Sequence, residues 1–159
     1  MKADLIISGG RVIDGTGQNS RVADVVINKG RITGVGDFVA DVEADRTLNA
    51  DGKCVAPGFI DAHTHDDRVL LSSPDMSCKI SQGVTTVVTG NCGVSLAPLE
   101  NVDPPPPLNL LGDREWYRFG TTAAYANELR EEPAAINSLM LVGHSTLRIA
   151  TMDLSLIHI

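Results

Sequence analysis

The run Val84-Thr85-Thr86-Val87-Val88-Thr89 consists only of β-branched residues, and it constrains the fold of this chain more than any other segment. β-Branched residues favour strands. A continuous run of this kind is typical of a strand buried on both faces, as in parallel sheets that are covered by helices. The run therefore predicts an inner strand of an α/β protein.

Other segments after Pro57 alternate between strand and helix patterns. The expected elements are a strand over 59–61, a helix over 74–82, a helix over 121–131 and a strand over 136–142. The Pro-rich segment 103–107 suits neither a helix nor an inner strand, so we expect a rigid excursion there. Alternating strands and helices predict parallel βα units.

The first 57 residues have a different pattern, in which short runs of Val, Ile and Leu are separated by Gly and Asp. The runs 23–27 and 31–35 flank Asn28-Lys29-Gly30, which predicts a β-hairpin. Further strand candidates are 4–8, 11–14 and 46–49. These features predict a small domain of antiparallel strands.

Two histidines follow the strand expected at 59–61. In an extended strand alternate side chains point to the same side, so Asp61, His63 and His65 are expected on one face. Two imidazoles on one face can chelate one metal ion, and neutral imidazole suits zinc. Asp61 is expected to accept the ring N–H of one histidine. A surface turn without any ligand is equally compatible with the His-Thr-His spacing alone.

Cys92 and His144 follow the next two expected strands, so metal-capable side chains stand at three successive strand ends. In α/β barrels that rim carries the catalytic groups. Cys92 is flanked by glycines, and its thiolate is a strong zinc ligand, although a buried core cysteine is the alternative. For His144 a purely structural role is at least as well supported as a pocket role. Cys54 and Cys78 are assigned to packing.

Composition limits the partners and the compartment. The net charge is −7, from 13 basic and 20 acidic residues, which argues against nucleic acid or an anionic membrane surface as a partner. No apolar run approaches the ~20 residues of a membrane span. The chain begins without a signal-peptide pattern. Its three cysteines do not form a disulfide framework, so we expect a cytoplasmic protein.

These residues together resemble the N-terminal part of amidohydrolase-superfamily enzymes, specifically the D-aminoacylase or N-acyl-D-amino-acid deacylase family. The resemblance covers the chain from Asp4 to about Met152. The segments that carry it are 4–10 with Asp14-Gly15, 56–67, 90–95, 104–112 and 141–148. The first two segments are shared by many amidohydrolases, whereas the other three are more specific to the deacylases.

The resemblance implies a TIM-like (β/α)₈ barrel beside a small β domain, with about three βα units in this chain. It implies that His63, His65 and Cys92 bind Zn²⁺, the cysteine standing where cyclic-amide hydrolases place a carboxylated lysine. Asp61 and His144 are assigned to the surroundings of the pocket. Two further histidines and the general-base aspartate are expected beyond residue 159. The implied reaction is hydrolysis of a small N-acyl-D-amino acid to a carboxylate and a D-amino acid.

The length of the chain sets a further expectation. A (β/α)₈ barrel typically needs ~250 residues. The 159-residue chain is therefore expected to be an inactive fragment, with a β domain over 1–57 and the first βα units over 58–153. The stretch 154–159 resembles a translated sequencing adapter, and no function is expected for His158.

Two alternative functions are compatible with the sequence. The first is another amidohydrolase, such as a cyclic-amide hydrolase, which a lysine at the end of a middle barrel strand would favour. The second is a non-catalytic zinc module in which Cys54, His63, His65 and Cys92 form a closed structural site. Those spacings differ from the usual paired-ligand zinc modules, so the second alternative is less favoured.

Overall fold

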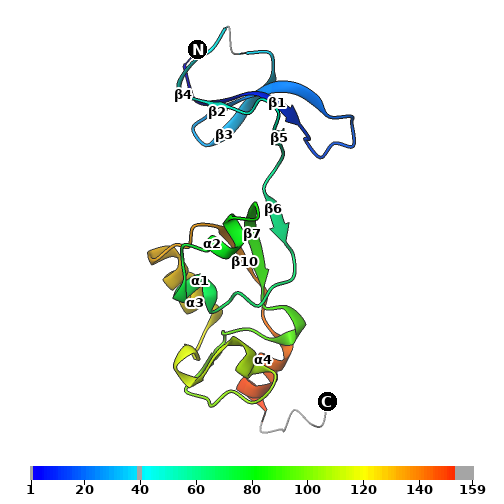
Figure 1. Cartoon of the computed structure of the whole chain (residues 1–159). Helices are drawn as coiled ribbons and strands as arrows, with labels where there is room; N and C mark the ends of the chain where they lie inside the picture. The colour runs from blue at the N-terminus through cyan, green and yellow to red at the C-terminus, as the bar shows by residue number, and fades with distance from the viewer. Residues whose placement is uncertain (1, 39–40, 153–159) are drawn as a thin grey trace. The chain divides into compact units, whose positions relative to one another are not determined.

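The computed structural model describes residues 2–38 and 41–152 and divides the chain into two compact units, Met1–Pro57 and Gly58–Ile159. Figure 1 shows an all-β first unit and a second unit that mixes strands and short helices. The stretch 154–159, with His158, lies outside the described residues. No helix among the described residues is long and apolar enough to cross a membrane.

The first unit is built on a five-stranded mixed sheet. Its strands are β1 (Lys2–Val12), β2 (Arg21–Asn28), β3 (Arg31–Gly36), β4 (Glu43–Asn49) and β5 (Cys54–Val55). The antiparallel prediction is confirmed for β1–β2 and β2–β3 but wrong for β4 and β5, which both pair with β1 in parallel. Hairpin geometry applies only to strands joined by a tight turn, and neither β4 nor β5 is joined to β1 in that way.

The predicted hairpin is confirmed in β2 and β3. Asn28 pairs with Arg31, and the turn residues Lys29 and Gly30 have φ values of 50° and 70°. Two successive positive φ angles are what a two-residue type I′ turn requires. By contrast, β1 does not end at Gly9 as expected. It continues through an irregularity between Ile7 and Gly10, which is typical of a β-bulge.

The second unit contains a parallel sheet of three strands in the order β10-β7-β6. The strands are β6 (Phe59–Asp61), β7 (Val84–Thr89) and β10 (Asn137–Met140), so the predicted strands and their parallel pairing are confirmed. β7 is less buried than expected, because Thr85 is exposed while Val87 and Thr89 are buried. Adjacent parallel strands end at the same edge of the sheet, and this edge carries the candidate site.

The helices of the second unit are mostly short. They are α1 (Val69–Ser72), α2 (Ser77–Ile80), α3 (Thr122–Glu131) and α4 (His144–Thr151). The helix predicted over 74–82 is reduced to α2, because Met76 has a left-handed conformation (φ 46°) just before it. α3 agrees with its prediction, and the hydroxyl of Thr121 caps its first turn by accepting the N–H of Ala124.

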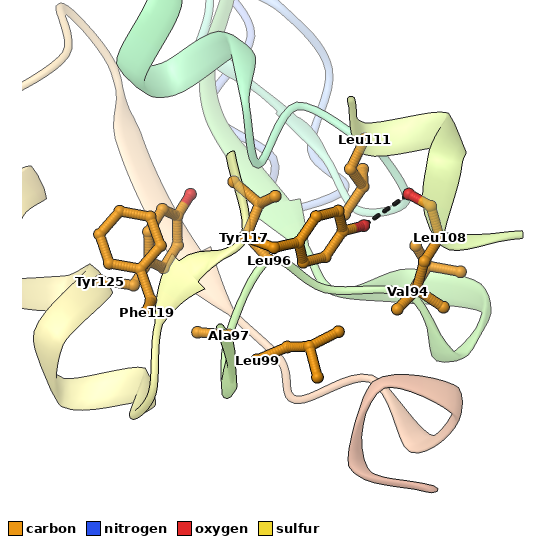
Figure 2. Packing of buried hydrophobic residues seen from close by; sticks show 9 residues of the cluster. All are labelled: Val94, Leu96, Ala97, Leu99, Leu108, Leu111, Tyr117, Phe119 and Tyr125. Atoms are coloured by element: carbon orange, nitrogen blue, oxygen red, sulfur yellow. Dashed lines mark hydrogen bonds between the residues drawn. The ribbon is translucent and has the colours of Figure 1, made fainter. Parts of the chain in front are cut away.

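The segment between β7 and α3 supplies most of a buried hydrophobic cluster, to which α3 adds Tyr125. It contains the 3₁₀ helices Asn91–Gly93, Leu108–Leu111 and Arg114–Trp116 and the antiparallel pair β8 (Leu99–Glu100) and β9 (Arg118–Phe119). Figure 2 shows the buried cluster, in which the Tyr117 hydroxyl donates to the carbonyl of Leu108. The loop that follows Cys92 is therefore packed, which steadies the end of β7.

Candidate metal centre

Three metal-capable side chains meet at the edge of the parallel sheet. The ligand atoms of His63, His65 and Cys92 all lie within 4.8 Å of one another. Nε2 of His63 is 2.9 Å from Sγ of Cys92, and the two imidazole centroids are 5.8 Å apart. The histidines follow β6 and the cysteine follows β7, which are paired neighbours in the sheet. The structure thus brings together the three ligands predicted from the sequence.

The histidine segment is shaped by a contact with β7 rather than by a continuous strand. β6 ends at Asp61, so both histidines lie beyond it. The N–H of Thr64 donates to the carbonyl of Val88 at 3.2 Å, and the Thr64 side chain is buried. The histidine on either side is less buried, His63 being exposed and His65 half-buried. The buried threonine anchors the segment from which both imidazoles project.

Cys92 occupies a tight turn directly after β7. Its φ and ψ are 53° and 23°, in the left-handed region that costs a non-glycine residue roughly 1 kcal/mol. Gly90 before it and Gly93 after it also have positive φ. A Cβ on Gly90 would lie 2.0 Å from the carbonyl oxygen of Leu141, so only glycine fits there. The turn keeps the cysteine at the strand end instead of folding it into the core.

The three cysteines are free and exposed. The alternative of a buried core cysteine is therefore wrong for Cys92. The assignment of Cys54 and Cys78 to packing is also wrong, because β5 has only two residues and α2 only four, and such short elements bury little of their surface. Cys54 belongs to the sheet of the first unit, where it pairs with Arg11 of β1.

The donor set fits a zinc ion. Two imidazole nitrogens and a thiolate are preferred zinc ligands, and donors about 2.0–2.3 Å from a tetrahedral zinc lie about 3.3–3.6 Å from each other. The observed cluster needs only small side-chain rotations to reach that spacing. In addition, Nδ1 of His65 is buried without a hydrogen-bond partner, and a buried nitrogen in that state is suited to a ligand or a proton acceptor.

Asp61 supports the histidine segment differently from the expected way. Its Oδ1 accepts the backbone N–H of His63 at 3.3 Å, and its Oδ2 contacts Nζ of Lys79 at 2.7 Å. The hydrogen bond from Lys79 holds the pKa of Asp61 below its ordinary value. Asp61 therefore orients the backbone of His63, whereas the prediction had it accept a ring N–H.

Lys79 and Asp67 are functional candidates that the sequence reasoning missed. Nζ of Lys79 also forms an ion pair with Oδ2 of Asp66 at 2.9 Å. Burial alone would lower the pKa of Lys79, but its contacts with Asp61 and Asp66 outweigh that effect and raise it. The one sequence signal for such a lysine was the excess of acidic residues around the histidines. Neighbouring carboxylates favour a positively charged side chain close to them.

Asp67 links the histidine segment to the core. It is 1% exposed, its Oδ1 accepts the N–H of Leu96 at 3.4 Å, and its carbonyl accepts the hydroxyl of Tyr125 at 2.8 Å. Burial raises the pKa of the Asp67 carboxyl to about 6. No spacing rule in the sequence distinguished this residue from the exposed aspartates.

His144 lies outside the three-residue cluster. It is the first residue of α4 and is exposed. The start of α4 is nevertheless tied to the loop after Cys92, because the N–H of Gly143 donates to Oγ of Ser95 at 2.9 Å. Oγ1 of Thr146 accepts the N–H of Ser95 at 2.9 Å, and both contacts are buried. These bonds give the start of α4, and with it His144, a defined place beside the loop that carries Cys92.

Comparisons with known proteins agree on one family. A model of the amidohydrolase family matches residues 46–154. The N-acyl-D-aspartate deacylase of Alcaligenes xylosoxydans xylosoxydans is 52% identical over 152 residues, which cover 96% of this chain and 30% of that relative. This chain therefore spans about 30% of the length of the curated relatives it matches.

Two solved structures extend the similarity to three dimensions. A D-aminoacylase studied for the functional role of its binuclear metal centre matches with a TM-score of 0.91 at 54% identity, over 95% of this chain and 32% of that one. The N-acyl-D-glutamate deacylase of Bordetella bronchiseptica, complexed with zinc and a phosphonate mimic of the tetrahedral intermediate, matches with a TM-score of 0.89 at 45% identity. That match covers 96% of this chain and 32% of the deacylase.

Proposed function

This chain belongs to the amidohydrolase family, and from that premise we propose that it carries part of the zinc site of an N-acyl-D-amino-acid deacylase. The reaction is hydrolysis of the amide bond of an N-acyl-D-amino acid to a carboxylate and a free D-amino acid. The observation that carries the proposal is the cluster of His63, His65 and Cys92, in a chain whose relatives include deacylases of N-acyl-D-aspartate and N-acyl-D-glutamate.

In this proposal His63 and His65 present imidazole nitrogens and Cys92 presents its thiolate. Zinc at this position supplies a Lewis acid that polarises the amide carbonyl and lowers the pKa of water. The turn at Gly90 fixes the cysteine, and the bond from the His63 N–H to Asp61 fixes one histidine. These three side chains would supply only part of the ligand set of such a zinc site.

The general base is a separate requirement. Asp61 and Asp66, which flank the histidines, are both paired with Lys79, and Asp67 is buried against Leu96. These contacts disfavour all three as a mobile proton acceptor for water. We place the general base and the remaining ligands beyond residue 159.

We also propose a specific architecture for the mixed α/β arrangement of the second unit. We propose that β6, β7 and β10 are the first three strands of a (β/α)₈ barrel and that 1–57 belongs to a separate β domain. The parallel order of these strands and the clustering of polar groups at their carboxyl ends support it. The free thiols support a reducing, cytoplasmic setting, because a thiolate ligand must remain reduced.

A chimera provides the test of function. Residues 1–152 of this chain replace the corresponding part of a D-aminoacylase, and release of D-amino acids from N-acetyl-D-amino acids is measured with zinc, after chelation and after zinc is restored. We expect zinc-dependent turnover that His63→Asn abolishes, whereas Cys78→Ala, at an exposed thiol outside the cluster, retains activity. A folded, zinc-loaded chimera without turnover, or full turnover in His63→Asn, contradicts the proposal.

A further inference from the structure

We propose that Lys79 is a positioning residue of the metal site, which clamps the segment 61–66 and thereby keeps His63 and His65 oriented toward Cys92. The inference rests on the proposed metal site and adds to it a residue outside the proposed ligand set. The proposed role of Lys79 is to orient the ligand side chains before any metal binds.

The clamp is a set of contacts from one ammonium group to one short segment. Nζ of Lys79 lies 2.7 Å from Oδ2 of Asp61, 2.9 Å from Oδ2 of Asp66 and 3.4 Å from Oγ1 of Thr64. Asp61 precedes the first histidine, Thr64 stands between the two, and Asp66 follows the second. One side chain therefore fixes the segment before, between and after the candidate ligands.

Lys79 is itself held in place by the fold. It lies on α2, which begins directly after the fully buried Met76. Met76 packs in a core cluster with Leu70 and Val87, and Val87 belongs to the central strand β7. The clamp thus joins the histidine segment to the strand that precedes Cys92. Both halves of the candidate site then share one rigid support.

The burial of these ion pairs separates them from ordinary surface pairs. The side chains of Lys79, Asp61 and Asp66 are 20%, 31% and 14% exposed. By contrast, the Lys2–Asp45 side chains are 62% and 55% exposed. Exposed pairs contribute little to stability and order, whereas a half-buried ammonium with several acceptors restricts the chain that carries them.

Removal of Lys79 distinguishes a clamp from a simple charge effect. By Coulomb's law alone, loss of a positive charge beside the site should strengthen binding of a divalent cation. If Lys79 positions the histidines, its removal should weaken binding of the cation. Part of the binding free energy must then be used to order the two histidines. The two explanations predict opposite signs for the same substitution.

The experiment titrates Co²⁺ into the reduced 159-residue chain and into Lys79→Met, and it follows thiolate-to-cobalt and ligand-field absorption. We expect affinity about tenfold lower in Lys79→Met, the loss typical when a support of metal ligands is removed. The thiolate band should persist at saturation while the ligand-field bands change. The matched control is Lys53→Met, an exposed lysine of the first unit, which should bind cobalt as the wild type does.

Circular dichroism and thermal unfolding with chelator establish that the variants are folded. If Lys79→Met does not fold, Lys79→Gln replaces it, since it also removes the positive charge and the ion pairs with Asp61 and Asp66, and it too should weaken cobalt binding severalfold. Unchanged or tighter binding in the folded Lys79 variant overturns the clamp alone. A folded wild-type chain that binds no cobalt overturns the proposed metal site, and the clamp with it.

Discussion

Nε2 of His63 lies 2.9 Å from Sγ of Cys92, although the two residues are 29 positions apart in the sequence. The parallel pairing of β6 and β7 creates this proximity, because Asp61 at the end of β6 is paired with Val87 near the end of β7. A strand end and a glycine-flanked turn therefore place an imidazole and a thiol side by side. The predictions below test this arrangement and its supports.

Zinc binding should depend on Cys92 and not on the other exposed cysteine of the second unit. Cys92→Ala removes the thiolate ligand, so zinc affinity of the purified chain should fall by about tenfold or more. Cys78→Ala is the matched control, since Cys78 is equally free and exposed but lies outside the cluster. Competition with a chromogenic chelator measures the zinc affinity of each variant. Equal affinity in the two variants excludes Cys92 as a ligand.

Alanine at Gly90 should destabilise the chain strongly. A left-handed φ of 79° costs alanine about 1 kcal/mol, and the new methyl group would also meet the carbonyl oxygen of Leu141 at 2.0 Å. Gly83→Ala is a close control, because φ is 80° there and the nearest side-chain atom lies at 3.4 Å. Urea unfolding should show a loss of free energy for Gly90→Ala about 2 kcal/mol larger than for Gly83→Ala. Equal losses would argue against a close contact between Gly90 and Leu141.

The pH dependence of stability should carry a contribution from Asp67. Burial raises the pKa of its carboxyl to about 6, so the folded state retains this proton to higher pH than the unfolded state. The free energy of unfolding in chelator should therefore fall as pH rises from about 4 to about 6, by an amount on the order of 2 kcal/mol. Asp67→Asn keeps an acceptor for the Leu96 N–H and should remove this decline. A decline of the same size in Asp67→Asn assigns it to other groups.

The 159-residue polypeptide by itself should not hydrolyse N-acetyl-D-amino acids. Its candidate ligands are present, but Asp61 and Asp66 are paired with Lys79 and Asp67 is buried, so none is suited to accept a proton from water. D-amino acid release by the zinc-loaded chain should stay at the level of the buffer, measured beside a complete deacylase as positive control. Turnover comparable to the control would contradict the proposed division of roles.

Part of the fold could be predicted because it depends on neighbouring residues. The turn at Lys29 and Gly30, the β-branched run of β7 and the end of α3 before Pro133 are local features, and each agrees with the structure. The failures concern pairing and burial. The parallel place of β4 beside β1 and the exposure of Cys54 depend on which segments meet.

In the candidate site, too, some features could be predicted from local sequence and others depended on distant contacts. The sequence by itself determined the donor chemistry, since His63, His65 and Cys92 follow recognisable strands and suit zinc. Only the tertiary structure decided their support: Asp61 accepts a backbone N–H, and Lys79 on α2 contacts residues of the histidine segment that lie 13 to 18 positions before it. The physical reason is that strand and turn preferences arise within a few residues, whereas ion pairs between distant segments form only after the sheet and its core have fixed where each segment lies.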